Sequence, residues 1–264
     1  MNLLILYAMK VFSLYEGSYS VDVSKEFIPF DPEIHKKKDR PGSLFIHIHP
    51  FLIQTEDDLI LLDTGLGQMK DGELVLYSNI KKQGFDPQDI TLVLLSHLHK
   101  DHASGMTYEQ NGKINLSFPN AEYVIQRSEW ENAFGNSDSD SYETSKLDVL
   151  QRSGNLHLVE GSGQLNDYIS FELSGGHTEF HQVFLLEKEG EKFFFGGDEW
   201  PEQAQILRKF AAKYDFNGKK AMELREEYAQ RAAKEGWTGL FYHDGKSDTA
   251  KREIKEDSYT IIKV

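Results

Sequence analysis

The chain has 264 residues, enough for one large α/β domain or two modest ones with a sizeable core. Its formal net charge of −14 makes nucleic acid a poor candidate substrate, because an acidic surface repels the phosphate backbone. The sequence contains no cysteine, which excludes a disulfide framework, a zinc–thiolate site and a thiol nucleophile. Any bound metal must therefore be held by histidine and carboxylate groups.

The first residues of the sequence carry no convincing export signal. The apolar run at residues 3–9 is short, no positive charge precedes it, and no clear small-residue cleavage site follows it. We therefore expect a first β-strand there. No apolar stretch approaches the ~20 residues of a membrane span, so the sequence favours a cytoplasmic enzyme without a membrane partner.

Hydrophobic patterning predicts strands that alternate with helices in the first half of the chain. Strands are predicted at residues 44–53, 59–62, 91–95 and 123–126, and helices at residues 74–84 and 127–134. The strand at 59–62 ends at the Asp63-Thr64-Gly65 turn, and the strand at 91–95 leads directly into a segment that begins at Ser96.

The second half of the chain shows the same alternation of predicted strands and helices. Residues 135–146 are polar and rich in Ser and Asp, and they predict an exposed connection between two halves, about 1–140 and 147–264, of a single domain. Strands are predicted at 156–159, 168–173, 183–187, 192–195 and 239–242, and helices at 201–213 and 221–234. The alternation in both halves indicates a layered α/β fold.

Four potential metal ligands fall within six residues after the buried strand at 91–95. They are His97, His99, Asp101 and His102, in the sequence HLHKDH. Residues two apart in an extended segment point the same way, so His97 and His99 can share one metal. Asp101 and His102, beyond the bend, can face a neighbouring metal. A chance histidine-rich turn is the poorer explanation, because this density of ligand types directly after a buried strand is uncommon.

The pattern resembles that of the metallo-β-lactamase superfamily, whose signature is His-x-His-x-Asp-His after a buried strand. The family's earlier Asp-Thr-Gly element corresponds to ILLDTGLG at 60–67. Its isolated His, Asp and His ligands correspond to residues within GGHT (175–178), FGGDEW (195–200) and FYHD (241–244). The resemblance covers nearly the whole chain and implies an α/β fold of the αββα sandwich type, two β-sheets flanked by helices, with the site along one edge.

The same resemblance implies two divalent metal ions, zinc in the first place, with manganese, iron or cobalt as alternatives. The implied ligands are His97, His99 and His177 for one metal, Asp101, His102 and His243 for the other, and Asp198 as the bridge. A water shared by two such cations ionises near neutral pH, so hydroxide would be the nucleophile and Asp101 and Asp198 the catalytic carboxylates. Asp63 is expected to support the metal loop without binding metal itself. His181 is expected either to support the ligands in the same way or simply to pack in the interior.

Other histidines and aromatic residues near the motif have more ordinary interpretations. Phe180 and Trp200 are next to ligands and are candidates for the substrate pocket, although core packing is the more common fate of such side chains. His47 and His49 are interpreted as strand residues on one face, with pocket lining as the alternative. His157 is expected to be structural.

Within the superfamily, the sequence is most similar to the acyl-homoserine lactonase branch. It has Asp198 but no cysteine ligand, unlike the true metallo-β-lactamases, and the 21 residues after His243 are too few for the helical domain of glyoxalase II. The net charge disfavours the related nucleases. We therefore expect a hydrolase that cleaves a small ester or lactone with a metal-bridging hydroxide. An iron-dependent oxidoreductase acting on thiols or persulfides, and a phosphodiesterase, stay open as alternatives.

Two departures from the lactonase pattern affect the predicted substrate. Those enzymes carry a tyrosine three residues after the bridging aspartate, where this chain has Pro201. The family's GHTPGH stretch is GHTEFH here, with Glu179 and Phe180 in place of a tight Pro-Gly turn. The group that takes the place of the tyrosine, the small-molecule substrate and the oligomeric state therefore stay open.

Overall fold

The computed structural model describes residues 9–136, 139–206, 209–245, 249–255 and 258–263. The strands are β1 (Lys10–Ser13), β2 (Gly17–Val21), β3 (Ile28–Pro29), β4 (Leu44–Ile48), β5 (Phe51–Gln54), β6 (Leu59–Leu62), β7 (Met69–Lys70), β8 (Glu73–Leu74), β9 (Leu92–Leu94), β10 (Thr107–Gln110), β11 (Lys113–Leu116), β12 (Glu122–Gln126), β13 (Leu156–Val159), β14 (Gly163–Gln164), β15 (Ile169–Leu173), β16 (Gln182–Lys188), β17 (Glu191–Phe195), β18 (Thr238–Leu240), β19 (Thr249–Lys255) and β20 (Ser258–Lys263). The α-helices are α1 (Val75–Lys82), α2 (Lys100–Ala103), α3 (Arg127–Gly135), α4 (Thr144–Ser153) and α5 (Gly218–Glu235).

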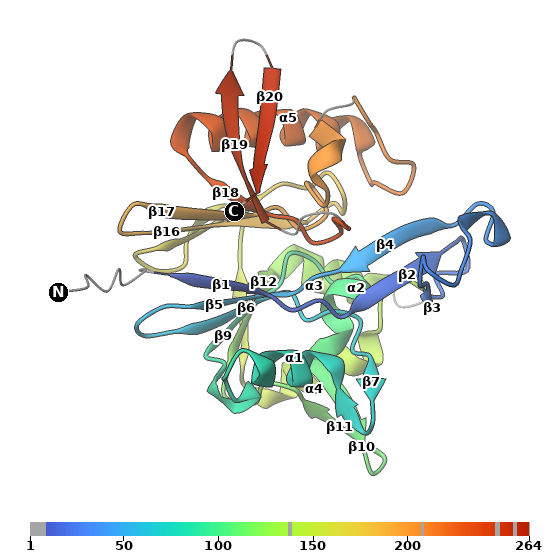
Figure 1. Cartoon of the computed structure of the whole chain (residues 1–264). Coiled ribbons are helices and arrows are strands. Elements are labelled where there is room, and N and C mark those ends of the chain that lie inside the picture. The colour runs from blue at the N-terminus through green and yellow to red at the C-terminus, as the bar shows by residue number, and fades with distance from the viewer. Residues whose placement is uncertain (1–8, 137–138, 207–208, 246–248, 256–257, 264) are drawn as a thin grey trace.

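Two large sheets form the middle of the molecule (Figure 1). The first has the order β1-β5-β6-β9-β12-β13, in which β6, β9, β12 and β13 run parallel. The second has the order β14-β15-β16-β17-β18-β19-β20, and its β17 and β18 are parallel. Helices α1 and α4 lie on one outer side of this pair of sheets and α5 lies on the other (Figure 1).

Alternate residues of the buried strands face different layers. Ile60 and Leu62 of β6 belong to a cluster between the sheets that includes Phe184 and Phe195 of the second sheet. Leu61, between them, belongs to the cluster formed with α1, α3 and α4. All four residues of β6 are buried, as expected for a parallel strand that is covered on both faces.

Helix α5 covers the outer face of the second sheet. Its Tyr228, Ala229 and Ala232 share an apolar cluster with Phe194 of β17 and with Trp200. The order of layers is therefore helices, sheet, sheet and helix, which confirms the predicted αββα sandwich. Among the described residues, no helix is long and apolar enough to cross a membrane.

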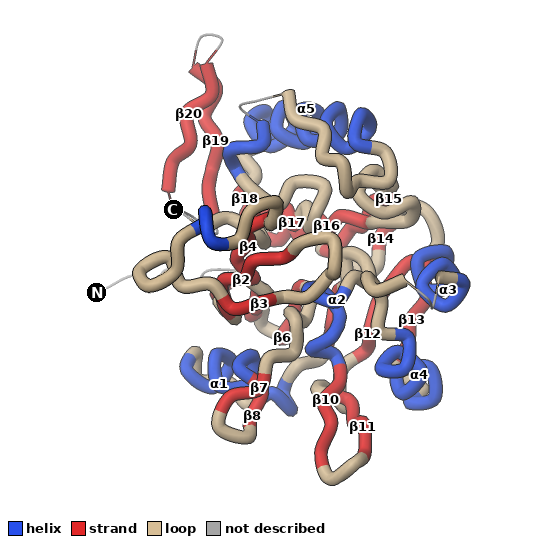
Figure 2. The backbone as a smooth tube through the Cα atoms, turned by 90° about the vertical axis from the view of Figure 1, so that its right-hand side faces the viewer, coloured by secondary structure: helices blue, strands red, loops and turns tan. Residues whose placement is uncertain are grey.

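A small third sheet, β3-β2-β4, corrects the prediction of one strand over residues 44–53. The chain leaves this sheet at His49 and Pro50, and β5 then joins β1 and β6 in the first large sheet. Pro50 has no N–H to donate to a strand ladder, which favours a break at that point. Figure 2 shows the small sheet in front of the large ones and near α2.

Other element predictions were also wrong in part. The helix expected over 201–213 is a short 3₁₀ turn, Gln203–Ile206, and residues 209–213 are not helical. Helix α4 begins inside the stretch predicted to be an exposed connection. The strand expected at 3–9 lies almost entirely outside the described residues, and β1 follows it. The strands predicted from 156 to 195 are all present within two residues of their expected ends.

Candidate metal centre

The residues predicted as metal ligands come together where several strands end. The loop after β9 continues into α2 and carries the HLHKDH segment, while the segments after β15, β17 and β18 carry the three distant residues. The seven residues that meet there are His97, His99, Asp101, His102, His177, Asp198 and His243. In the second sheet β15, β17 and β18 run in the same direction, so their carboxyl ends lie at one edge. The loop after β9 reaches this sheet, because Gln182 N–H donates to the carbonyl oxygen of Ser96 at 2.9 Å.

Asp198 lies at the centre of this cluster and contacts imidazoles on both of its oxygens. Its Oδ1 is 3.2 Å from His102 Nε2 and 3.1 Å from His243 Nε2. Its Oδ2 is 3.2 Å from His177 Nε2. One carboxylate therefore faces the two sides of the cluster at once.

The possible donor atoms fall into three overlapping groups, and within each group the atoms are close enough together to bind one metal ion. Ligand atoms lie within 4.8 Å of one another in three sets, namely His97 with His99 and His177, His97 with His102 and Asp198, and Asp101 with His102 and His243. His97 Nε2 is buried and makes no hydrogen bond. Buried polar atoms without partners are costly, and imidazole and carboxylate donors suit zinc and similar divalent ions. The residues present therefore fit a pair of divalent metals.

The pKa shifts of His97 and Asp198 suit metal binding, whereas for His102, His177 and His243 the effect of burial is outweighed by Asp198 and other carboxylates, which raise the pKa values of these imidazoles. Burial, followed by the neighbouring imidazoles of His102 and His99, lowers the pKa of His97 well below its usual range. Burial alone would raise the pKa of Asp198, but His243, His102 and His177 together lower it well below its usual range. A neutral imidazole and an ionised carboxylate are the forms that bind metal ions.

Three of the imidazoles direct Nε2 into the cluster because their Nδ1 atoms are held from outside it. The Nδ1 partners are Asp63 Oδ2 for His102 at 2.6 Å, Asp215 Oδ1 for His177 at 2.9 Å, and the carbonyl oxygen of His47 for His243 at 2.6 Å. Such partners fix the tautomer and the orientation of a ligating imidazole.

Asp63 and His181 both contact the segments that carry the candidate ligands. Asp63 also accepts hydrogen bonds from the backbone N–H and the hydroxyl of Ser96, each at 2.7 Å. His181 Nε2 accepts from the N–H of Asp198 at 3.1 Å, and its Nδ1 is 2.8 Å from Ser174 Oγ. Gly197, just before Asp198, has φ +49°, and a Cβ there would lie 2.7 Å from His181 Nε2.

Sequence reasoning missed a set of buried carboxylates that hold the ligand loops. Glu199 accepts from the N–H groups of Gly176 and His177, at 2.5 and 3.0 Å. Glu129 accepts from Leu98 N–H at 3.1 Å and from Thr178 Oγ1 at 2.9 Å. Asp215 and Glu16 complete the set. Only Glu199 had a local signal, its position beside Asp198.

Glu16 joins the start of β2 to the loop that follows Asp63. Its two carboxylate oxygens accept from Leu66 N–H at 2.6 Å and Gln68 N–H at 2.7 Å. Gly65 has φ +74°, and a Cβ there would lie 2.2 Å from Glu16 Oε2, so only glycine fits this approach. Burial raises the pKa of Glu16 from 4.5 to about 7, and the backbone N–H donors oppose that shift.

This raised pKa predicts a pH-dependent loss of stability. The folded chain binds the Glu16 proton more tightly than the unfolded chain does, so the stabilisation is complete below pH 4.5 and is lost as the pH rises through about 7. A shift of this size corresponds to ~3 kcal/mol. Glu16→Gln is uncharged, so its free energy of unfolding should gain ~3 kcal/mol relative to wild type between pH 5 and pH 8.5.

Urea unfolding of both proteins at several pH values measures this difference. The predicted quantity is the change with pH, because the amide also loses one acceptor for the N–H groups of the loop. Glu56→Gln, at an exposed turn, is the matched control and should show no such change. A difference between Glu16→Gln and wild type that is constant with pH would contradict the prediction.

The structure also places the two candidate pocket residues and the histidines that were not predicted to be ligands. Trp200 is 3% exposed and packs with Phe241 in the core beneath α5, so its packing does not support the pocket interpretation. Phe180 is half-buried. His47 Nδ1 is 2.7 Å from Ser18 Oγ, and neither His47 nor His49 joins a metal-sized group among the described residues. His157 is on β13, with Nδ1 3.0 Å from Glu122 Oε1.

Known proteins are similar in sequence to part of this chain. An N-acyl homoserine lactonase from Bacillus sp. is 28% identical over 170 residues, which cover 56% of this chain and 62% of that protein. The N-acyl homoserine lactonase AttM from Agrobacterium fabrum is 30% identical over 169 residues, which cover 58% of each. The chain therefore matches less than two thirds of the length of these curated relatives.

Solved structures share the fold over nearly the whole chain. A probable metal-dependent hydrolase from Staphylococcus aureus has a TM-score of 0.77 at 24% identity and covers 97% of this chain and 98% of its own. AidC, described as a dizinc quorum-quenching lactonase, has a TM-score of 0.72 at 22% identity and covers 97% and 94%. A family model described as the metallo-beta-lactamase superfamily matches residues 46–232. With that match over most of its length, the chain belongs to the metallo-β-lactamase superfamily.

Proposed function

We propose that this protein is a dinuclear metal-dependent hydrolase that cleaves a small carboxylic ester or lactone. The observation that carries the proposal is the position of Asp198, whose two oxygens lie 3.1–3.2 Å from imidazoles on both sides of the cluster. A carboxylate in this place can bridge two cations. Two cations held there supply Lewis-acid polarisation of the carbonyl group and an ionised water.

The residues of the chain have distinct roles in this proposal. His97, His99 and His177 would hold one metal, and Asp101, His102 and His243 would hold the other. The carboxylate of Asp101, whose Oδ2 is 3.5 Å from His243 Nε2, takes the proton released when water adds to the carbonyl carbon. The acyl C–O bond then breaks, and the proton passes to the leaving alkoxide oxygen.

The ester or lactone class is favoured by the relatives and by charge. The relatives named above are N-acyl homoserine lactonases. The chain's net charge of −14 disfavours a polyanionic substrate. Zinc is the proposed metal because imidazole and carboxylate donors form the ligand set that it commonly takes.

The first test of the proposal is the metal content. The seven ligands and the shared Asp198 predict about two equivalents of metal per chain, measured by elemental analysis of protein purified without added metal and again after incubation with zinc. His243→Ala should deplete mainly one of the two, because His243 belongs to only one of the three ligand groups. A value of one equivalent that does not rise with excess zinc contradicts the dinuclear site.

The second test is the reaction. Zinc-loaded protein is assayed with acyl-homoserine lactones of several chain lengths, simple lactones, aryl esters, a β-lactam and bis-p-nitrophenyl phosphate, with Asp101→Ala as the blank. Turnover of lactones or esters that the variant loses supports the proposal. Turnover of the phosphodiester alone would replace it with a phosphodiesterase. Iron as the bound metal, together with oxygen consumption on a thiol or persulfide, would replace it with an oxidoreductase.

A further inference from the structure

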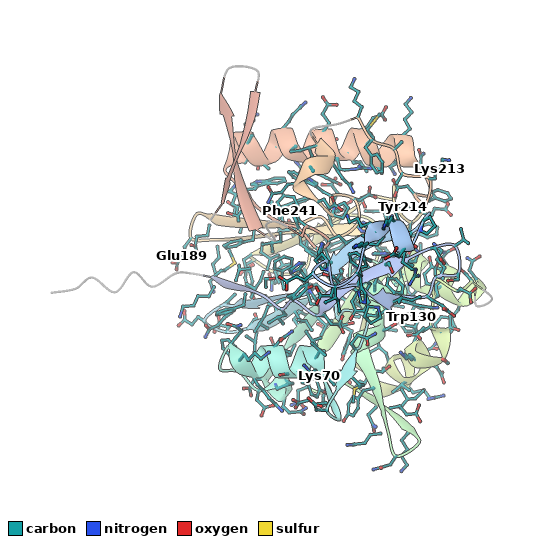
Figure 3. The ribbon with its side chains drawn as sticks, turned by 45° about the vertical axis from the view of Figure 1, so that its right-hand side comes forward. Lys70, Trp130, Glu189, Lys213, Tyr214 and Phe241 are labelled. Atoms are coloured by element: carbon teal, nitrogen blue, oxygen red, sulfur yellow. The ribbon has the colours of Figure 1, made fainter. Side chains whose placement is uncertain are left out.

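Tyr214 lies beside the metal cluster on a segment that no sequence pattern had singled out. Its ring is 5.9 Å from the ring of His177, edge to face, and the side chain is 40% exposed. In Figure 3 the residue lies between α5 and the N-terminal sheet that contains β4. Burial, followed by the negative charge of Asp198, raises the pKa of Tyr214. The residue is therefore close to the cluster and open to a molecule that approaches it.

The segment that carries Tyr214 is fixed to the loop of His177. Asp215 Oδ1 is 2.9 Å from His177 Nδ1, and Phe216 N–H donates to the carbonyl oxygen of His177 at 2.9 Å. Asn217 N–H donates to the carbonyl oxygen of Gly176 at 2.8 Å. These contacts join the three residues that follow Tyr214 to one ligand loop, so Tyr214 is held next to the loop of His177.

The hydroxyl groups of the other tyrosines near the cluster already have partners. Tyr242 donates to the carbonyl oxygen of Asp101 at 2.6 Å. The hydroxyl of Tyr142 is 3.3 Å from Asn132 Nδ2, and that of Tyr15 is 2.5 Å from Ser18 Oγ. Within the part of the chain that the structure describes, the hydroxyl of Tyr214 bonds to no other residue.

We infer that the Tyr214 hydroxyl donates a hydrogen bond to the carbonyl oxygen of the ester or lactone, and to the oxyanion that forms from it. The inference rests on the proposed function and names a catalytic residue for it. The phenol keeps its proton throughout, since an ordinary tyrosine is protonated at neutral pH. Pro201, three residues after Asp198, offers no side-chain donor, and its carbonyl oxygen accepts from His243 N–H at 3.0 Å.

The test compares Tyr214→Phe with wild type, both loaded with zinc. A contact that strengthens in the transition state affects kcat more than KM. We expect kcat to fall on the order of 10- to 100-fold with little change in KM, less than the ~10²–10³ of a donor that acts alone. Metal content should stay unchanged, because Tyr214 is not a ligand. Calorimetry with N-hexanoyl-L-homoserine, an open-chain product, should show affinity weaker by about tenfold, the loss of one hydrogen bond to a carboxylate.

Tyr142→Phe is the matched comparison. The ring centre of Tyr142 lies 5.2 Å from that of His99, much as the ring of Tyr214 lies against that of His177. Its kcat and product affinity should stay within about twofold of wild type. If Tyr214→Phe retains both quantities, or if Tyr142→Phe shows the loss instead, the inference is wrong while the proposed function stands. Wild-type protein that holds two metals yet cleaves no ester or lactone overturns the proposed function, and the inference with it.

Discussion

Replacing Asp198 with alanine should weaken both proposed metal sites together and abolish measurable hydrolysis. Asp198 is the only one of the seven ligand residues whose two oxygens contact imidazoles of different ligand groups, at 3.1–3.2 Å. Without it, two cations would repel each other across the cluster with no negative charge between them. Loss of an outer partner of a ligand costs ~10–100-fold in metal affinity, and loss of a shared ligand should exceed that for both sites.

Competition with a chromophoric chelator measures the two affinities separately. Asp198→Asn keeps the shape of the side chain but removes its charge, so it should fall between alanine and wild type. His157→Ala is the control, since His157 is on β13 and pairs with Glu122 away from the cluster. Asp198→Ala protein that still binds two equivalents with wild-type affinity would falsify the bridging role.

The clustering of the motif residues was predictable because its information is local. His97, His99, Asp101 and His102 follow one buried strand, and the spacing of the first two alone suggests a shared metal. The distant ligands needed the family resemblance, because nothing in GGHT or FYHD specifies a metal by itself. What unites them is that each follows a strand, and the sheets bring these strand ends to one place.

The carboxylates that hold the ligand loops could not be predicted in the same way. Glu16 binds backbone N–H groups that are 50 and 52 residues away in the sequence. Glu129 and Asp215 likewise bind groups in other segments. Nearly every residue has a backbone N–H, so residue types alone do not indicate which N–H group a given carboxylate will bind. Only the folded chain shows the pairing.

The failed helix over 201–213 shows tertiary contacts overriding local preference. The stretch PEQAQILRKFAAK begins with proline and contains good helix formers, so a helix was a reasonable prediction. In the structure the chain past this stretch instead contacts the loop of His177, through Asp215 and Phe216. Tyr214, which lies beside the cluster, directly follows the stretch that does not form the predicted helix.

Asp63→Asn and Asp63→Ala should change stability and metal affinity to different extents. Asp63 accepts hydrogen bonds from Ser96 that stabilise the fold, and it also orients the imidazole of His102. Asp63 is fully buried and has φ +54°, a conformation that asparagine adopts more readily than alanine. Alanine would leave the N–H and hydroxyl of Ser96 and the Nδ1 of His102 without their acceptor. Each unpaired buried group costs ~1–3 kcal/mol, so the alanine variant should lose ~3–5 kcal/mol of unfolding free energy.

Asparagine separates the two roles. Its amide oxygen can still accept from Ser96 N–H, so its loss of stability should be smaller than that of alanine. Its amide N–H₂, however, would face His102 Nδ1 and place the ring proton on Nε2, which is the atom that points into the cluster. We therefore expect Asp63→Asn to lower metal affinity by at least ~10–100-fold.

Denaturant unfolding of the metal-free proteins and chelator competition measure these two effects independently. Asp71→Ala is the matched control, because Asp71 also has φ +54° but lies in an exposed turn, so it reports only the backbone cost of alanine, roughly 1–2 kcal/mol. If Asp63→Asn binds metal as tightly as wild type, Asp63 does not set the tautomer of His102. If Asp63→Ala is no less stable than Asp71→Ala, the three buried hydrogen bonds contribute nothing to the folding of this loop.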